Sequence, residues 1–137
     1  MALYSPFKNY IWNLSVAIAM ESGGRIGEIV DMCQPILDAA DNGGDAGTPQ
    51  FMQAWAGMGH KLLELAAEDE AKGREFSASD KLERASLYLL VAERMQGHGT
   101  KGREETYALA RETFDKSTRL GKINRERVEM PLENGTM

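Results

Sequence analysis

Apolar residues recur every three or four positions along most of the chain, which is the spacing of one face of an α-helix. The pattern is strongest between Ser77 and Gln96, where one face carries Leu82, Ala85, Leu89, Ala92 and Met95. Residues 87–91 add apolar side chains on the other faces, so we expect neighbouring elements to enclose this helix. Ser77 and Asp80 form a capping signature at its start, and Gly97 follows its end.

Four further helices are predicted from the same spacing and from typical start and stop residues. Two of them begin with a hydroxyl residue followed by proline, Ser5–Pro6 and Thr48–Pro49, which is a common helix start. Pro35 lacks an amide donor, so we expect it to kink or break the second helix. The five predicted helices span residues 5–22, 26–40, 48–72, 77–96 and 101–120, the last with Tyr107, Ala110 and Phe114 facing inward. Short loops between about five helices predict an all-α, antiparallel bundle.

The last residues of the chain follow a different pattern. Apolar and charged residues alternate from Arg127 to Glu133, which is typical of a half-buried β-strand, and Asn134–Gly135 is a hairpin-turn dipeptide. Because a strand needs a partner, we expect this one to begin a sheet that the chain does not complete. The predicted organisation is a helical domain over residues 1–122, followed by a linker and first strand over residues 123–137.

Composition narrows the class of protein further. The chain has 137 residues and is 42% hydrophobic, which suffices for one core. Its net charge is −5 and Lys and Arg do not cluster, so we expect no nucleic-acid partner. No apolar run approaches the ~20 residues that span a bilayer, so we expect no membrane role. The single cysteine, Cys33, excludes an internal disulfide and favours a cytoplasmic location.

Residues that could carry chemistry form no complete catalytic or metal-binding pattern. Gly97–Gly102 has the spacing G-x-G-x-x-G, but it follows a helix rather than a strand, so an interhelix turn is predicted. Cys33 lies on an apolar stripe and is interpreted as a core residue. His60, Glu64 and Glu68 lie one turn apart, where a solvated helix edge is favoured over a metal site. No G-x-S-x-G nucleophile motif occurs, and no metal or cofactor is expected.

Several short motifs follow one another along the chain in a definite order. They are Gly23-Gly-Arg-Ile-Gly-Glu28, Trp55, Gly73-x-x-x-Ser77-Ala, Arg84-Ala-Ser-x-Tyr88 with Ala92-Glu93, Tyr107, Phe114, and Val128-Glu-Met-Pro-Leu-Glu-Asn-Gly135. Their order and spacing resemble the N-terminal helical region of α/β-hydrolases related to the fermentation–respiration switch esterases and to dihydroxypseudooxynicotine hydrolase. The resemblance extends from about Phe7 to the end of the chain. Leu89 and Pro35 depart from the pattern, which affects the expected pocket shape.

The resemblance implies that this region is a helical lid, or cap, over the catalytic domain of a serine hydrolase. Such a lid would shape the pocket for a small or polyketide-like substrate, cleaved at an ester, amide or carbon–carbon bond, and could belong to a dimer interface. The family's catalytic residues would follow Met137, on the same or a separate chain. We therefore assign none here and expect the isolated chain to be inactive.

The resemblance also suggests which side chains would line or support the pocket. The expected pocket contacts are Phe7, Tyr10, Trp55 and Tyr88. Glu28 and Arg84 are expected to support the pocket wall from behind. Arg84 has apolar neighbours on its helix, and a buried guanidinium needs a carboxylate partner.

A reading from another class stays open at this point. The same helices could form a stand-alone interaction or dimerisation module with no catalytic role. In either case the expected partners are proteins, including a second copy of the chain. Only in the lid function would the chain also contact a small-molecule substrate.

Overall fold

The computed structural model describes residues 4–41, 48–132 and 135–136, and nearly all regular structure in them is helical. Its elements are α1 (Tyr10–Glu21), α2 (Ile26–Cys33), the short 3-10 helix η1 (Gln34–Ile36), α3 (Leu37–Asp41), α4 (Pro49–Ala71), α5 (Glu75–Arg94), α6 (Arg103–Leu120), β1 (Pro131–Leu132) and β2 (Gly135–Thr136). The predicted all-α class is confirmed. The helix predicted from residue 26 is divided into α2, η1 and α3, and the interruption falls at Pro35, as expected from its missing amide donor.

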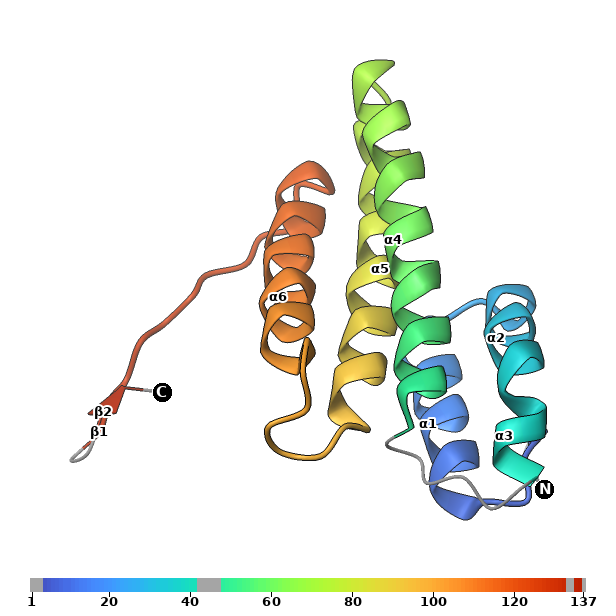
Figure 1. Cartoon of the computed structure of the whole chain (residues 1–137). Helices are drawn as coiled ribbons and strands as arrows, with labels where there is room; N and C mark the ends of the chain where they lie inside the picture. The colour runs from blue at the N-terminus through green and yellow to red at the C-terminus, as the bar shows by residue number, and fades with distance from the viewer. Residues whose placement is uncertain (1–3, 42–47, 133–134, 137) are drawn as a thin grey trace.

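Helix α5 lies in the middle of the fold, as its sequence predicted. It packs against α4 on one side and α6 on the other, and the three run side by side as an antiparallel layer (Figure 1). Helix α1 contacts α5 and α2 contacts α4, so the first three helices gather around one end of the α4–α5 pair. Because it has neighbours on several sides, α5 buries side chains around most of its circumference.

A row of aromatic rings forms the centre of the main core. Phe7, Trp12, Phe51, Trp55 and Tyr88 follow one another with ring centroids 5.2, 5.1, 5.4 and 5.9 Å apart. Three of these contacts are edge-to-face and one is stacked, the arrangements that aromatic pairs prefer. The row joins the segment before α1 to α1, α4 and α5, so it holds the N-terminal helices onto the long helical pair.

Glycine permits the closest approach of α4 and α5. A Cβ atom added at Gly59 would lie 2.8 Å from the Leu89 side chain and 3.3 Å from the Ala85 carbonyl oxygen. Small residues at a crossing let two helices pack more tightly than larger side chains allow. Beyond this crossing a second, smaller core of Ala66, Ala78 and Leu82 continues the packing toward the α4–α5 turn.

Two predicted helix starts differ from the observed ones, by five residues for α1 and by two residues for α5. Helix α1 begins at Tyr10 rather than at Ser5, because the Asn9 side chain accepts hydrogen bonds from the amides of Ile11 and Trp12. The segment before it is held by Asn13, whose side chain bonds both backbone groups of Phe7. Asparagine is as good a cap as serine, so composition alone could not choose between the two positions.

Helix α5 also begins earlier than predicted. Its first residue is Glu75, and no side chain caps it, whereas Ser77 lies inside the first turn. The Ser77 hydroxyl donates instead to Asp69 at the end of α4, 2.6 Å away. The capping signature read from Ser77 and Asp80 is therefore wrong, and the two residues make tertiary contacts. By contrast, the predicted start of α4 at Thr48–Pro49 is confirmed, although the Thr48 side chain makes no capping bond.

The strand predicted over residues 127–133 is not formed as expected. Residues 123–130 have no regular structure, and only Pro131–Leu132 pairs with Gly135–Thr136 as a two-residue antiparallel ladder. The turn residue Asn134 lies outside the described residues. Figure 1 shows this tail extending away from α6. Within the described residues, no helix has the length and apolarity needed to cross a bilayer.

Candidate functional site

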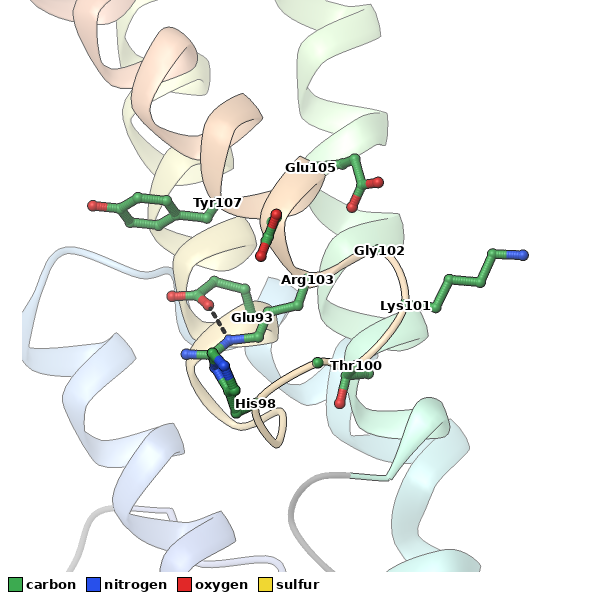
Figure 2. Close-up of a pocket in the computed structure, with 10 residues that line it drawn as sticks. Glu93, His98, Thr100, Lys101, Gly102, Arg103, Glu105 and Tyr107 are labelled. Carbon is green, nitrogen blue, oxygen red and sulfur yellow. Dashed lines mark hydrogen bonds and ion pairs between the residues drawn. The ribbon is translucent and has the colours of Figure 1, made fainter.

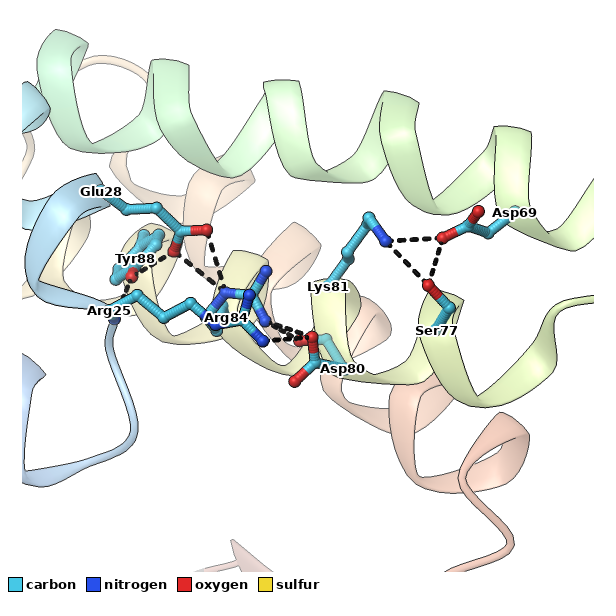
Figure 3. A network of polar contacts seen from close by, with 8 residues as sticks. All are labelled: Arg25, Glu28, Asp69, Ser77, Asp80, Lys81, Arg84 and Tyr88. Atoms are coloured by element: carbon cyan, nitrogen blue, oxygen red, sulfur yellow. Dashed lines mark hydrogen bonds and ion pairs between the residues drawn. The ribbon is translucent and has the colours of Figure 1, made fainter.

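The densest polar arrangement in the described residues surrounds Arg84, in the middle of α5 (Figure 3). Its Nε donates to both carboxylate oxygens of Glu28, at 3.1 and 2.9 Å, and its Nη1 donates to the Asp80 carboxylate at 2.6 Å. The Tyr88 hydroxyl donates to Glu28 at 2.6 Å and accepts from the Arg25 amide at 2.9 Å. We call Arg25, Glu28, Asp80, Arg84 and Tyr88 the Arg84 cluster. The carboxylate partner predicted for Arg84 is thus confirmed.

The local sequence explains how these side chains meet. Glu28 is in the first turn of α2, where a carboxylate is favoured by the helix dipole. Asp80, Arg84 and Tyr88 are four residues apart on α5, so they share one face. That face meets the start of α2, because the chain turns between α1 and α2 beside the middle of α5.

Burial and hydrogen bonding shift the pKa values of three groups in the cluster. Burial opposes the charge on Arg84, but the hydrogen bonds to Asp80 and Glu28 outweigh it and raise the pKa of the guanidinium. Burial likewise opposes the charge on Asp80, yet the bonds from Arg84 lower the pKa of that carboxyl. Burial and the bond to Glu28 raise the pKa of Tyr88. The phenol therefore donates to Glu28, and the hydrogen bonds of the cluster join the first turn of α2 to the middle of α5.

A second group of polar side chains lies near the start of α5. Lys81 donates to Asp69 at 2.6 Å and to the Ser77 hydroxyl at 2.9 Å (Figure 3). The bonds from Lys81 and then from Ser77 lower the pKa of Asp69 to about 2. This group therefore joins the end of α4 to the start of α5.

Three of the four side chains predicted to contact a substrate are buried. Phe7, Trp55 and Tyr88 belong to the row of aromatic rings, so they contact other core residues. Only Tyr10 is open, with 72% of its surface exposed on the first turn of α1. The two residues predicted to support the pocket wall, Glu28 and Arg84, are directly bonded. The structure thus brings Glu28, Arg84 and Tyr88 together and leaves Tyr10 apart.

Two larger hollows lie on the surface of the α5–α6 pair. One, of about 510 Å³, surrounds the turn between the helices, where Arg103 donates to Glu93 at 3.0 Å (Figure 2). The other, of about 440 Å³, is an apolar groove lined by Leu87, Leu90, Tyr107, Ala110 and Phe114, with Glu83 and Arg111 on its walls. We call it the α5–α6 groove. The interhelix turn predicted at Gly97–Gly102 is confirmed.

The groove corrects the predicted orientation of α6. Tyr107 and Phe114 were expected to face inward, but 44% and 42% of their surfaces are exposed. The inward positions are taken by Ala110, Thr113 and Ser117, and Ser117 accepts a hydrogen bond from Ser79. Small residues at this interface bring α5 and α6 close together, and the large rings are displaced to its edge. Their i, i+7 spacing was the signal of an apolar face, but not of which face the core uses.

The groups that most often carry catalysis are not assembled in the described residues. His60 and His98 are both exposed, and neither bonds to a serine, cysteine or carboxylate there. Burial raises the pKa of Cys33 to about 12, so the thiol is an unreactive core residue, as predicted. No group of three metal-ligating side chains in the described ranges is placed to hold an ion.

The fold and the site together define a helical bundle stiffened by paired polar clusters, with an apolar groove on one side. Comparisons of the chain with protein-family models, with curated proteins and with solved structures found no match. Function is therefore inferred from the sequence motifs and from the surfaces that the bundle leaves uncovered.

Proposed function

We propose that this chain is the helical lid of a cytoplasmic serine α/β-hydrolase and that it shapes the substrate pocket without supplying reacting groups. The ordered motifs from Gly23 to Gly135 support this proposal through their resemblance to the helical region of such enzymes. An all-helical bundle is also compatible with a lid. The substrate would be a small molecule with an ester, amide or cleavable carbon–carbon bond, and the reaction would need no cofactor from this chain.

One structural observation carries the proposal beyond the resemblance. Tyr10, Ile11 and Leu14 form an exposed apolar face on α1, although the same helix buries Trp12, Val16 and Ala19 in the core. Apolar patches of this kind mark surfaces that another domain or a ligand covers. A lid that closes over a catalytic site needs such a face, because it excludes water and supplies apolar walls. Tyr10 remains the proposed substrate contact on this face.

The remaining candidates have supporting parts in the proposal. Phe7, Trp55 and Tyr88 form the rigid layer beneath α1, since they belong to the same row of rings as Trp12. Glu28 and Arg84 hold that layer from the other side through Tyr88. A pocket wall supported in this way keeps its shape when the lid closes, which favours orientation of a bound substrate.

The experiment tags the protein at its N-terminus in its native host, recovers it and measures its intact mass. A fluorophosphonate probe, which labels activated serines, is then applied to two samples. In one of them the activated serines have first been blocked with an unlabelled inhibitor. We expect a labelled serine outside residues 1–137, on the same polypeptide or on a second one that copurifies. The purified 137-residue chain should remain unlabelled and should not hydrolyse p-nitrophenyl esters.

An alternative function, a stand-alone interaction module, is favoured by the α5–α6 groove, which could serve a protein partner without any enzyme. Recovery of a 15.1 kDa protein with no labelled partner would support that function and contradict the lid. Labelling of a serine within residues 1–137 would contradict both.

A further inference from the structure

The α5–α6 groove is an apolar surface open to water. Leu90, Tyr107 and Phe114 are each about two-fifths exposed, at 41%, 44% and 42%. Leu87 and Ala110 lie between them in the floor of the groove. Large apolar side chains concentrated in one groove favour burial by a partner.

Each wall of the groove carries one charged side chain. Glu83 is on the α5 wall and Arg111 on the α6 wall. The Arg111 guanidinium lies 5.8 Å from the centre of the Tyr107 ring, but neither residue forms an ion pair within the described ranges. The groove therefore presents an acid and a base on opposite sides of an apolar floor.

The register between α5 and α6 determines the height of Glu83 and Arg111, meaning their positions along the helix axes. Ser79 donates to the Ser117 carbonyl, Ser86 donates to the Ala110 carbonyl, and Arg103 donates to Glu93. Successive contacts are seven residues apart on both helices, as in an antiparallel coiled coil.

This register can be extended to the residues of the groove. Glu83 lies level with Thr113 and Arg111 lies level with Ala85. The two charges thus differ in height by two residues, or about 3 Å along the helices. Leu90 lies level with Thr106, next to Tyr107.

We propose that the α5–α6 groove is a two-fold interface with a second copy of this chain. A two-fold axis parallel to the helices places α5 against the partner's α6 and keeps every residue at its own height. Glu83 then faces the partner's Arg111, and Leu90 faces the partner's Tyr107. The four helices form a bundle in which facing helices are antiparallel.

A second copy of the chain matches the charges and the apolar floor of the groove better than a small ligand does. An apolar carboxylate could pair with Arg111, but Glu83 would then face it with a like charge. In the symmetric arrangement each copy's Glu83 pairs with the other copy's Arg111, so the interface has two ion pairs, and the apolar floor is covered. Such charge pairing is the electrostatic complementarity found at specific interfaces. This assignment deepens the proposed function by locating a dimer face, but its test reads mass rather than hydrolysis, so the two can fail independently.

The test measures the mass of the purified chain by sedimentation across a concentration series. We expect twice the chain mass of 15.1 kDa. Glu83→Arg and Arg111→Glu should each weaken the dimer at least about tenfold, since each places two like-charged pairs at the interface. The double variant E83R/R111E should restore the dimer. Glu112→Arg, an exposed acid outside the groove, is the matched control and should leave the dimer unchanged.

Circular dichroism of every variant checks that the helices are retained. A wild-type chain that is monomeric at 100 μM, on the order of the highest concentration used for such assays, would overturn the interface. A dimer that survives both single reversals would also overturn it, as would a double variant that stays monomeric. Binding of an anionic apolar dye in the groove of a monomeric chain would assign the groove to a small ligand instead.

Discussion

Glu28 and Arg84 are 56 residues apart in the chain, yet the Arg84 Nε donates to both oxygens of the Glu28 carboxylate. Only 7% of the Arg84 side chain is exposed, whereas 21% of the Glu28 side chain is. The contact joins the first turn of α2 to the middle of α5. It also orients Tyr88, the last ring of the aromatic row. One ion pair thus connects the charged surface of α2 to the core.

Replacement of Arg84 should strongly destabilise the fold. Arg84→Met removes the cation and leaves Glu28 without its main partner, so we expect the free energy of unfolding to fall by about 3 kcal/mol. Urea unfolding followed by circular dichroism measures this loss. Arg94→Met, an exposed arginine on the same helix, should cost less than about 1 kcal/mol. Equal losses in the two variants would show that the Arg84 cluster does not stabilise the fold.

Two glycines on α4 should respond to alanine in opposite directions. Gly59→Ala places a Cβ atom 2.8 Å from Leu89, so we expect a loss of about 1–3 kcal/mol from overpacking. Gly57→Ala meets no atom within 4 Å and should stabilise the helix by about 0.5–1 kcal/mol. Thermal unfolding of the two variants measures both changes in stability. A stabilised Gly59→Ala variant would contradict the close α4–α5 crossing.

The start of α1 can be tested at two positions. Asn9→Ala removes the side-chain oxygen that accepts from the first free amides of the helix, and should cost about 1 kcal/mol. Ser5→Ala lies outside the helix and should change stability by less than about 0.5 kcal/mol. Urea unfolding measures both. A larger loss of stability in Ser5→Ala than in Asn9→Ala would instead support the helix start predicted from Ser5–Pro6.

Asp69 should make the stability of the protein depend on pH in the acid range. Its pKa is lowered to about 2 in the fold, below the value of about 3.9 expected in the unfolded chain. Its contribution is therefore complete above about pH 4 and is lost as the pH falls toward 2. The difference in unfolding free energy between wild type and Asp69→Asn should shrink from pH 5 to pH 2.

The neighbouring acid provides the control for that measurement. Glu68 is exposed and lies 3.9 Å from Lys72, a weak surface pair. Glu68→Gln should therefore change the free energy of unfolding by less than about 1 kcal/mol. A constant difference between wild type and Asp69→Asn over the same range would contradict the bond from Lys81 as the cause of the lowered pKa.

Helical spacing was enough to predict which segments form helices and that α5 is enclosed, because the period of 3.6 residues is a property of the backbone. The interruption at Pro35 followed from its missing amide donor, and the carboxylate partner of Arg84 followed from the cost of burying an unpaired charge. Helical spacing by itself had limits. It did not predict that Asn9 rather than Ser5 begins α1, since both residues can cap a helix. Nor did it predict the partners of Ser77, because side chains from α4 compete with the local capping bond.

What the sequence determined by itself is local: the helices, their approximate ends and the apolar stripes that they carry. The tertiary structure decided which stripe each helix buries. On α6 the small residues Ala110, Thr113 and Ser117 face α5, and Tyr107 and Phe114 remain at the edge of the groove. The reason is physical. Periodicity is set by neighbours along the chain, whereas burial depends on the shape and distance of other helices, which no single stripe encodes.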